Sequence, residues 1–484
     1  MLFNSVEFPF FLIVAFTCYW LIPKSKIKWQ NLFVLAASYF FYGWWDWRFL
    51  ILIFLSSATD YFVALQLEKT ENEKRKQSLL GLSLLVNLGI LVYFKYFNFF
   101  IDSFVDLMSV VGIGLNFDSL NIILPVGISF YTFQTLSYTI DVYRGDLKAS
   151  KEPLSFFAYV SFFPQLVAGP IERASDLLPQ FKKPRRFDTI KSADGLRQIL
   201  WGLFKKILIA DNLAPIVQNV FSDYESMPPV VLFIGVCLFS IQIYCDFSGY
   251  SDIAIGTARL FGFELNQNFR FPFFSKNITE FWRRWHISLS NWLRDYLFIP
   301  LSIKFRGLGS NGIILSMMLT FILCGLWHGA RWTFIVFGFF QGLVLTYEFL
   351  STKKRIKVKK RMNKNLYNAI SLILTFLFWK FSMVLFRSDD LPQAFHFLDL
   401  MLSLDLFSFS AGDLLLLAEK IDLLKLSIFI LFMLGMEILQ REKLHGFEIH
   451  NYKWYTKLVL YTAIGVCLLL FAPIGSSDFI YFQF

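Results

Sequence analysis

Long apolar runs constrain this chain more than any other feature of its sequence. A run of roughly 20 apolar residues has the length of a membrane-crossing helix, and only helices or closed barrels satisfy every backbone group in hydrocarbon. Of the 484 residues, 56% are hydrophobic and 17% are charged, and the mean hydropathy is +0.53. The runs recur at about 8–22, 30–45, 49–66, 78–98, 122–140, 154–170, 196–221, 229–247, 287–301, 312–327, 331–350, 365–386, 424–440 and 455–472. The sequence therefore predicts an all-α, polytopic membrane protein with about 11–14 membrane helices, some of them short or re-entrant.

The positive net charge of +10 lies mainly in short loops between the apolar runs. This is the distribution of a positive-inside membrane protein, so we expect no nucleic-acid partner. The strongest cluster, KKRIKVKKR at 353–361, belongs in the cytoplasm, whereas the acidic segments 99–121 and 222–229 belong outside. Alternation then predicts a multi-pass membrane protein with both termini outside. No histidine or cysteine pair has the spacing of metal ligands, so we predict no metal site.

The run 154–170 interrupts this alternation, because the loops on both of its sides are basic. It contains Pro164, Gly169 and Pro170, which break a helix. We therefore expect a re-entrant or broken segment whose free backbone groups are satisfied by protein or by a water-filled cavity. An ordinary kinked helix is the alternative.

The stretch 281–331 carries ionisable side chains inside or beside apolar sequence. Charged groups in hydrocarbon are costly, so they mark a candidate functional site. They are Arg283, Arg284, His286, Arg294, Asp295 and His328. Read as one helix over 281–297, the stretch puts Arg284 and Asp295 on a polar stripe and His286 on the opposite, apolar side. Periodicity alone thus favours a packed histidine with one hydrogen bond at position 286.

His328 follows a short apolar run and precedes Gly329, so the chain should turn or loosen there. Trp327 and Trp332 flank it. An imidazole in an apolar, aromatic-walled cavity stays neutral, because desolvation lowers its pKa, and a neutral imidazole can accept a proton. A structural histidine at a helix junction is the alternative.

The segment 246–284 is too polar to cross a membrane and too apolar for a free loop. We expect short interfacial helices that line the mouth of a pocket, with Asp246, Ser248 and Tyr250 as hydrogen-bonding wall residues. Capping of helices by the Asp and Ser side chains is an equally good interpretation.

Two motifs, FWRRWHISLSNWLRDYLFIPL at 281–301 and GLWHGARWTF at 325–334, resemble the membrane-bound O-acyltransferase family in its bacterial polysaccharide branch. Further matches, spread over nearly the whole chain, are LPVGISFYTFQTLSY, VAGPIER, DFSGYSDIAIGTARLFGF, LFRS and the final FIYFQF. The resemblance implies His328 as the catalytic base and His286 as a second site residue. Trp327, Trp285, Arg283, Arg284, Asp295, Asp246, Ser248 and Tyr250 are the substrate-binding candidates. The chain departs from the branch at Gln341, where the branch usually has histidine.

The resemblance also implies what the protein does. It predicts transfer of an acyl group, most simply acetyl, from a cytoplasmic thioester donor such as acetyl-CoA to a hydroxyl of an exported polysaccharide. It predicts a location in the cell inner (cytoplasmic) membrane, a periplasmic or extracellular acyltransferase partner and no permanently bound cofactor. Transfer of D-alanyl or a longer acyl chain, and a transporter or flippase without chemistry, are the alternatives.

On this basis we expect one membrane-embedded domain over 1–484. Its N-terminal helices would occupy 1–150, its catalytic core 151–350 and its C-terminal helices 351–484. Because 287–301 and 312–327 are short for a bilayer of about 30 Å, we expect a central funnel from each face that meets near His328. Trp327, Trp332 and Trp285 would narrow this junction.

Overall fold

The computed structural model describes residues 1–115, 120, 122–167, 169–403, 412–417, 420–473 and 479–482. In these residues the chain forms helices and no strand, which confirms the all-α prediction. The helices divide into two compact units, residues 1–196 with 254–266, and residues 197–253 with 267–484. The division falls inside helices α10 (Thr189–Leu203) and α12 (Pro229–Leu260).

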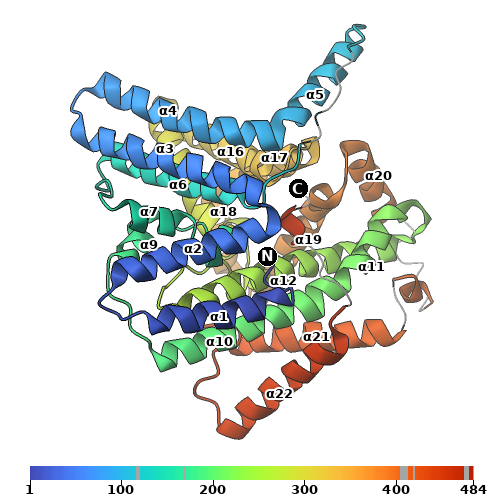
Figure 1. The fold of residues 1–484 in the computed structure, drawn as a ribbon. Coiled ribbons are helices and arrows are strands. Elements are labelled where there is room, and N and C mark those ends of the chain that lie inside the picture. Colours follow the sequence, from blue (N-terminus) through green and yellow to red (C-terminus); the bar gives the residue numbers. More distant parts are fainter. Residues whose placement is uncertain are drawn as a thin grey trace. The chain divides into compact units, whose positions relative to one another are not determined.

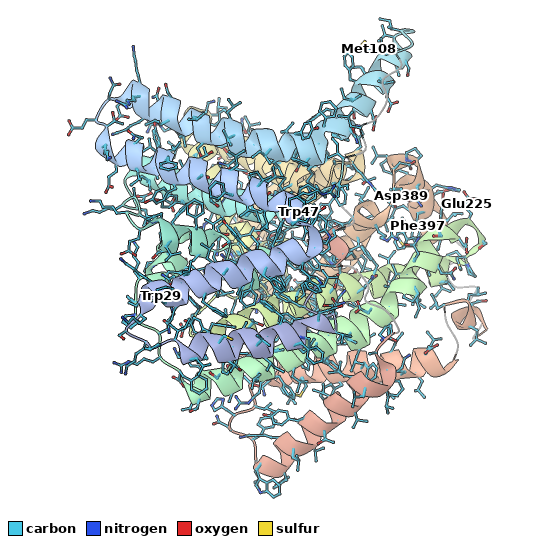
Figure 2. The ribbon with its side chains drawn as sticks, in the orientation of Figure 1. Trp29, Trp47, Met108, Glu225, Asp389 and Phe397 are labelled. Carbon is cyan, nitrogen blue, oxygen red and sulfur yellow. The ribbon has the colours of Figure 1, made fainter. Side chains whose placement is uncertain are left out.

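Seven helical stretches in the described part of the chain are long and apolar enough to cross a membrane. They are Ile27–Lys69, Glu73–Val110, Pro229–Leu260, Ser310–His328, Trp332–Leu350, Lys364–Arg387 and Trp454–Phe471. The protein is therefore a multi-pass membrane protein. The first stretch contains two helices, because Asp46 adopts an extended conformation and its side chain accepts a hydrogen bond from the backbone of Arg48. Figure 2 labels Trp29 near the beginning of the first of them and Trp47 just beyond its end.

The first unit is built on antiparallel helices, with α3 and α4 side by side in Figure 1. Its helices are α1 (Glu7–Leu21), α2 (Ile27–Asp46), α3 (Leu50–Lys69), α4 (Glu73–Leu91), α5 (Phe97–Val110), α6 (Ile128–Arg144), α7 (Pro153–Val160), α8 (Phe163–Leu166) and α9 (Ala174–Phe181). The acidic segment 99–121, which the loop charges place outside, thus begins within helix α5, and residues 116–119 and 121 lie outside the described part.

The segment 154–170 is broken as predicted, between α7 and α8. Protein groups satisfy the backbone at the break. The Phe163 amide donates to the Ser38 hydroxyl at 3.0 Å, and the carbonyl of Tyr159 accepts from the side chains of Gln134 and Gln165. The hydrogen bonds described at this break are thus made by side chains of the protein itself.

The second unit contains the remaining helices. They are α11 (Asp211–Ser222), α13 (Ile278–Trp282), α14 (Ile287–Leu293), α15 (Ile299–Lys304), α16 (Ser310–His328), α17 (Trp332–Leu350), α18 (Thr352–Arg361), α19 (Lys364–Arg387), α20 (Leu391–Met401), α21 (Lys420–Leu439) and α22 (Trp454–Phe471). Two π-helical segments, Phe204–Ala210 and Arg294–Phe298, continue α10 and α14. All of the site residues predicted from the sequence lie in this unit.

Helices α16 and α17 of the second unit pack closely together, because glycines remove the side chains between them. A Cβ atom at Gly325 would lie 2.1 Å from the carbonyl oxygen of Phe334, and one at Gly338 would lie 2.2 Å from that of Phe321. Small residues allow membrane helices to approach at backbone distance. This pairing fixes the end of α16, where His328 lies.

Candidate active site

His328 is the last residue of α16 and is 2% exposed. The next residue, Gly329, is extended, and a Cβ there would lie 2.2 Å from the ring of Phe334. The close packing therefore requires glycine, and the predicted turn after His328 is confirmed. The Nε2 atom of His328 lies 3.8 Å from the Sγ atom of Cys324, one helical turn earlier.

His286 lies in a break between two helices, so the prediction of one helix over 281–297 is wrong. Helix α13 ends at Trp282, α14 begins at Ile287, and His286 has a left-handed backbone with φ of 43°. A long-range partner holds this conformation. The Ile287 amide donates to the Asn268 carbonyl at 2.9 Å, and His286 Nδ1 lies 3.1 Å from the Asn268 side-chain oxygen. The polar stripe inferred from helical periodicity therefore does not exist as one surface.

Folding brings the two histidines into one group of rings, here called the histidine cluster: the buried His286, His328, Trp327 and Phe247, and the half-buried Tyr481. The Trp327 ring lies 5.7 Å from that of His286 and 5.1 Å from that of His328, between centroids. Phe247 lies 4.6 Å from His286, and Tyr481 lies 5.7 Å from His328 and 4.7 Å from Phe247. Burial lowers the pKa of His286 well below its ordinary value, and the nearby His328 lowers it further.

Two expected tryptophans lie elsewhere. Trp285 is 2% exposed and packs between Phe281, Phe269 and Trp379. Trp332 is 53% exposed, so it does not narrow a passage at His328. Its position at the beginning of α17 turns it away from the packed side of that helix.

Asp246, Ser248 and Tyr250 do not lie on short interfacial helices. They lie inside α12, which continues to Leu260, so they do not cap helices either. Buried lysines of the facing π-helical segment pair with the acidic residues of α12, which lets the helix continue. Lys206 Nζ lies 2.6 Å from Asp246 and 2.7 Å from Asp211, and Lys205 Nζ lies 2.6 Å from Asp252.

These pairs also place the other two wall candidates. The Ser248 hydroxyl accepts a hydrogen bond from Lys205 at 2.8 Å. The Lys206 ammonium lies 5.4 Å from the centre of the Tyr250 ring, which is fully buried. All three wall candidates thus belong to a buried polar network beside the histidine cluster.

A cavity of about 580 Å³ opens between α13, α14, α16, α17 and α18. Three arginines, Arg283, Arg294 and Arg355, and one carboxylate, Glu348, are among its lining residues, together with apolar side chains of α16 and α17. Glu348 caps α13 by accepting from the Ile278 and Thr279 amides at 2.8 and 3.0 Å. The cavity also reaches Ile287, the residue that follows His286.

The remaining charged candidates, Arg284 and Asp295, lie outside the lining of this cavity. Arg284 pairs with Glu280 at 3.1 Å and donates to the Arg270 carbonyl, and Asp295 pairs with Arg294 at 2.6 Å.

Comparison with known proteins shows to which family the chain belongs. A family model for the membrane-bound O-acyltransferases, abbreviated MBOAT, matches residues 148–388. The probable alginate O-acetylase AlgI of Azotobacter vinelandii is 39% identical over 409 residues, which are 83% of this chain and 78% of that protein. The chain belongs to the membrane-bound O-acyltransferase family. It is an O-acyltransferase, which decides against the transporter alternative.

Two further relatives act on other polymers by name. The peptidoglycan O-acetyltransferase of Helicobacter pylori is 35% identical over 84% of this chain and 80% of its own length. The teichoic acid D-alanyltransferase of Bacillus subtilis is 30% identical over 55% of this chain and 69% of its own length. The O-acyltransferase resemblance read from the motifs is thereby confirmed.

Within this O-acyltransferase, Lys205 and Lys206 are the residues that sequence reasoning missed. They are 2% and 1% exposed and lie in the middle of the apolar run 196–221. Two consecutive lysines in such a run are a signal in themselves, because a buried ammonium group needs a partner. In the sequence, nothing comparable marks Asn268 as a residue that holds the site.

Proposed function

We propose that this O-acyltransferase moves an acetyl group from a cytoplasmic thioester donor toward a hydroxyl of an exported cell-surface polysaccharide, with His328 as the base. The observation that carries the proposal is the histidine cluster. Two histidines from different segments flank Trp327 in a buried apolar setting, and one of them ends helix α16 at a turn.

The reaction requires His328 to lie next to the acceptor hydroxyl and to accept its proton. Its neutral imidazole accepts the proton of the acceptor hydroxyl while the hydroxyl oxygen attacks the thioester carbonyl. The tetrahedral intermediate then collapses, the carbon–sulfur bond breaks, and the thiolate takes the proton from the imidazolium. The rings around His328 exclude water, which would otherwise hydrolyse the thioester. Because His328 is buried, a substrate reaches it only when a ring of the cluster moves.

The cavity beside the cluster is our candidate site for the donor. A donor such as acetyl-CoA combines phosphates with an apolar arm, and guanidinium groups bind phosphate oxygens through paired hydrogen bonds. Arg283, Arg294 and Arg355 offer such groups, and the apolar lining continues to Ile287 beside His286. We assign Arg283 to direct contact with the donor. Asp295 pairs with Arg294 and so holds one lining arginine, whereas Arg284 pairs with Glu280 outside the lining.

His286 acts in this proposal through Trp327. Asn268 fixes its ring and its backbone, and the imidazole in turn packs against the indole that adjoins His328. The protein works with an acyltransferase partner on the outer face that completes transfer to the polymer. The names of the alginate and peptidoglycan relatives support an exported polysaccharide as acceptor.

Mass spectrometry of cell-surface polymers from cells with and without this protein tests the proposal. We expect polysaccharide O-acetyl esters to disappear with the protein and to return with the intact gene. Loss of D-alanyl esters instead, as the name of the teichoic acid relative would suggest, would overturn the acetyl assignment. Unchanged esters of every kind would overturn the acceptor class.

A further inference from the structure

The segment Phe479–Phe482 forms one wall of the histidine cluster. Phe479 is fully buried, and its ring centroid lies 4.6 Å from that of Tyr250 on α12. Ile480 is 5% exposed. Tyr481, from the same turn, lies against both Phe247 and His328. A short segment thus contributes a ring directly beside the proposed base.

A hydrogen bond from a backbone amide to a carboxylate connects this segment to α12. The Ile480 amide donates to the Asp246 Oδ2 atom at 2.7 Å. The other carboxylate oxygen, Oδ1, pairs with Lys206 at 2.6 Å, and Lys206 also pairs with Asp211. Asp246 is 3% exposed, so the bond lies in a setting where a charged acceptor binds an amide strongly.

The neighbouring ion pair provides a comparison within the same helix. Lys205 and Asp252 pair at 2.6 Å, and Asp252 also accepts from the Gln198 side chain. Both pairs join α12 to the π-helical segment before α11. Asp246 also accepts from the backbone of the segment that carries Tyr481, whereas the partners of Asp252 among the described residues are Lys205 and Gln198.

We propose that Asp246, oriented by Lys206, is a positioning residue that holds Tyr481 against His328 through the Ile480 amide. This inference rests on the proposed role of His328 as the base. Asp246 touches no substrate in this scheme. It keeps the wall of the cluster in place, so that the hydroxyl and the thioester meet at His328 without water.

The sharpest test removes the donor of the bond and is paired with a variant that changes the buried Ile480 side chain but keeps the donor. Ile480 is the first residue of a 3₁₀ turn, a position where proline fits because its amide is not needed within the turn. Ile480→Pro removes the N–H group. Ile480→Ala shortens the side chain but keeps the N–H group. We expect Ile480→Pro to lower kcat for acetyl transfer by about 100-fold with an unchanged KM for acetyl-CoA, and Ile480→Ala to stay within about tenfold of the native protein.

A native thiol gives a second measurement that does not depend on activity. Cys324 is buried beside His328, and we expect it to react with N-ethylmaleimide much faster in Ile480→Pro than in Ile480→Ala. Cys245, buried on α12, should stay unreacted in both variants and so reports that the fold is intact. Mass spectrometry of the two cysteine peptides gives both rates.

Asp246→Ala should reproduce the Ile480→Pro result. Asp246→Asn should restore activity only in part, because its single amide oxygen can accept from the Ile480 amide or from Lys206 but not from both. Asp252→Ala should leave Cys324 protected. An Ile480→Pro protein with native kcat and a protected Cys324 would overturn the inference. An equal effect of Asp246→Ala and Asp252→Ala on Cys324 would do the same. If Cys324 becomes exposed but His328 proves dispensable, the positioning is real and the proposed base is wrong.

Discussion

At the scale of single residues, Arg283 and Arg284 are neighbours with different surroundings. Arg283 lines the cavity, whereas Arg284 pairs with Glu280 outside its lining. We expect Arg283→Ala to raise the KM for acetyl-CoA by about tenfold or more, because a charge-assisted hydrogen bond contributes about 1.5–3 kcal/mol. Arg284→Ala is the matched control and should change KM far less. Steady-state kinetics of the purified protein measure both, and equal KM values in the two variants would contradict the donor site.

Glu172 predicts a dependence of stability on pH. Burial raises its pKa from 4.5 to about 8, against the opposing effect of the Asn266 donors at 2.6 and 2.8 Å. Between these two values the unfolded chain loses the proton while the folded protein keeps it, so the free energy of unfolding falls as pH rises from about 4.5 to about 8. The Tm in detergent should therefore fall more steeply across this window in the native protein than in Glu172→Gln. Parallel curves would show that Glu172 does not titrate there.

The two histidines show how far the sequence could lead. The end of α16 at His328 followed from an apolar run that stops before Gly329, a local signal. The break at His286 had none, because no proline or glycine lies in 281–297. Its cause is Asn268, which binds the backbone and the side chains around His286 from 18 positions away. Periodicity cannot detect a helix that ends through a distant partner.

At the scale of helices, a side chain added at the glycines between α16 and α17 should lower the free energy of unfolding. Gly325→Ala would place a methyl group 2.1 Å from a backbone oxygen, which must move, at a cost of about 1–3 kcal/mol. Gly435→Ala in α21 meets nothing within 4 Å and should be neutral or slightly stabilising. Thermal unfolding in detergent compares them. A Gly325→Ala protein as stable as Gly435→Ala would mean that the helices lie further apart.

The sequence predicted an interrupted helix correctly where the residues that break the helix lie within the same segment. Pro164 and Gly169 correctly indicated the break in 154–170, and the structure supplied only the partners, such as Ser38 for the Phe163 amide. In contrast, α12 runs on through Asp246 and Asp252 to Leu260, because Lys205 and Lys206 neutralise these acids from another helix. From sequence alone, a polar stretch therefore indicates the end of a membrane helix, because the residues of other helices that pair with it cannot be identified.

At the scale of the molecule, the helical membrane architecture followed from the apolar runs, and its orientation remains a prediction. Contacts in the second unit agree with it locally: His396 lies 3.7 Å from Glu225 in the acidic segment 222–229, and Arg331 pairs with Asp389. Figure 2 labels Glu225, Asp389 and Phe397 on this part of the unit. The basic helix α18 follows the opposite end of α17.

Cysteine labelling in intact cells tests this orientation. In a protein whose native cysteines are replaced, Glu225→Cys should react with a membrane-impermeant maleimide. Lys357→Cys, in the exposed basic helix α18, should react only after the membrane is opened, because basic segments stay in the cytoplasm. Reaction at position 357 in intact cells would reverse the orientation and place the cavity arginines on the outer face.

The most direct test of the account is single-turnover acetyl transfer from radiolabelled acetyl-CoA to a hydroxyl acceptor by the purified protein. His328→Asn keeps the size of the side chain roughly and removes the base, and we expect the rate to fall by about 10²–10⁴-fold with an unchanged Tm. His396→Asn, an exposed histidine of α20, is the matched control and should retain the native rate. A folded His328→Asn protein that transfers acetyl within a few-fold of the native rate would contradict the assignment of His328 as the base.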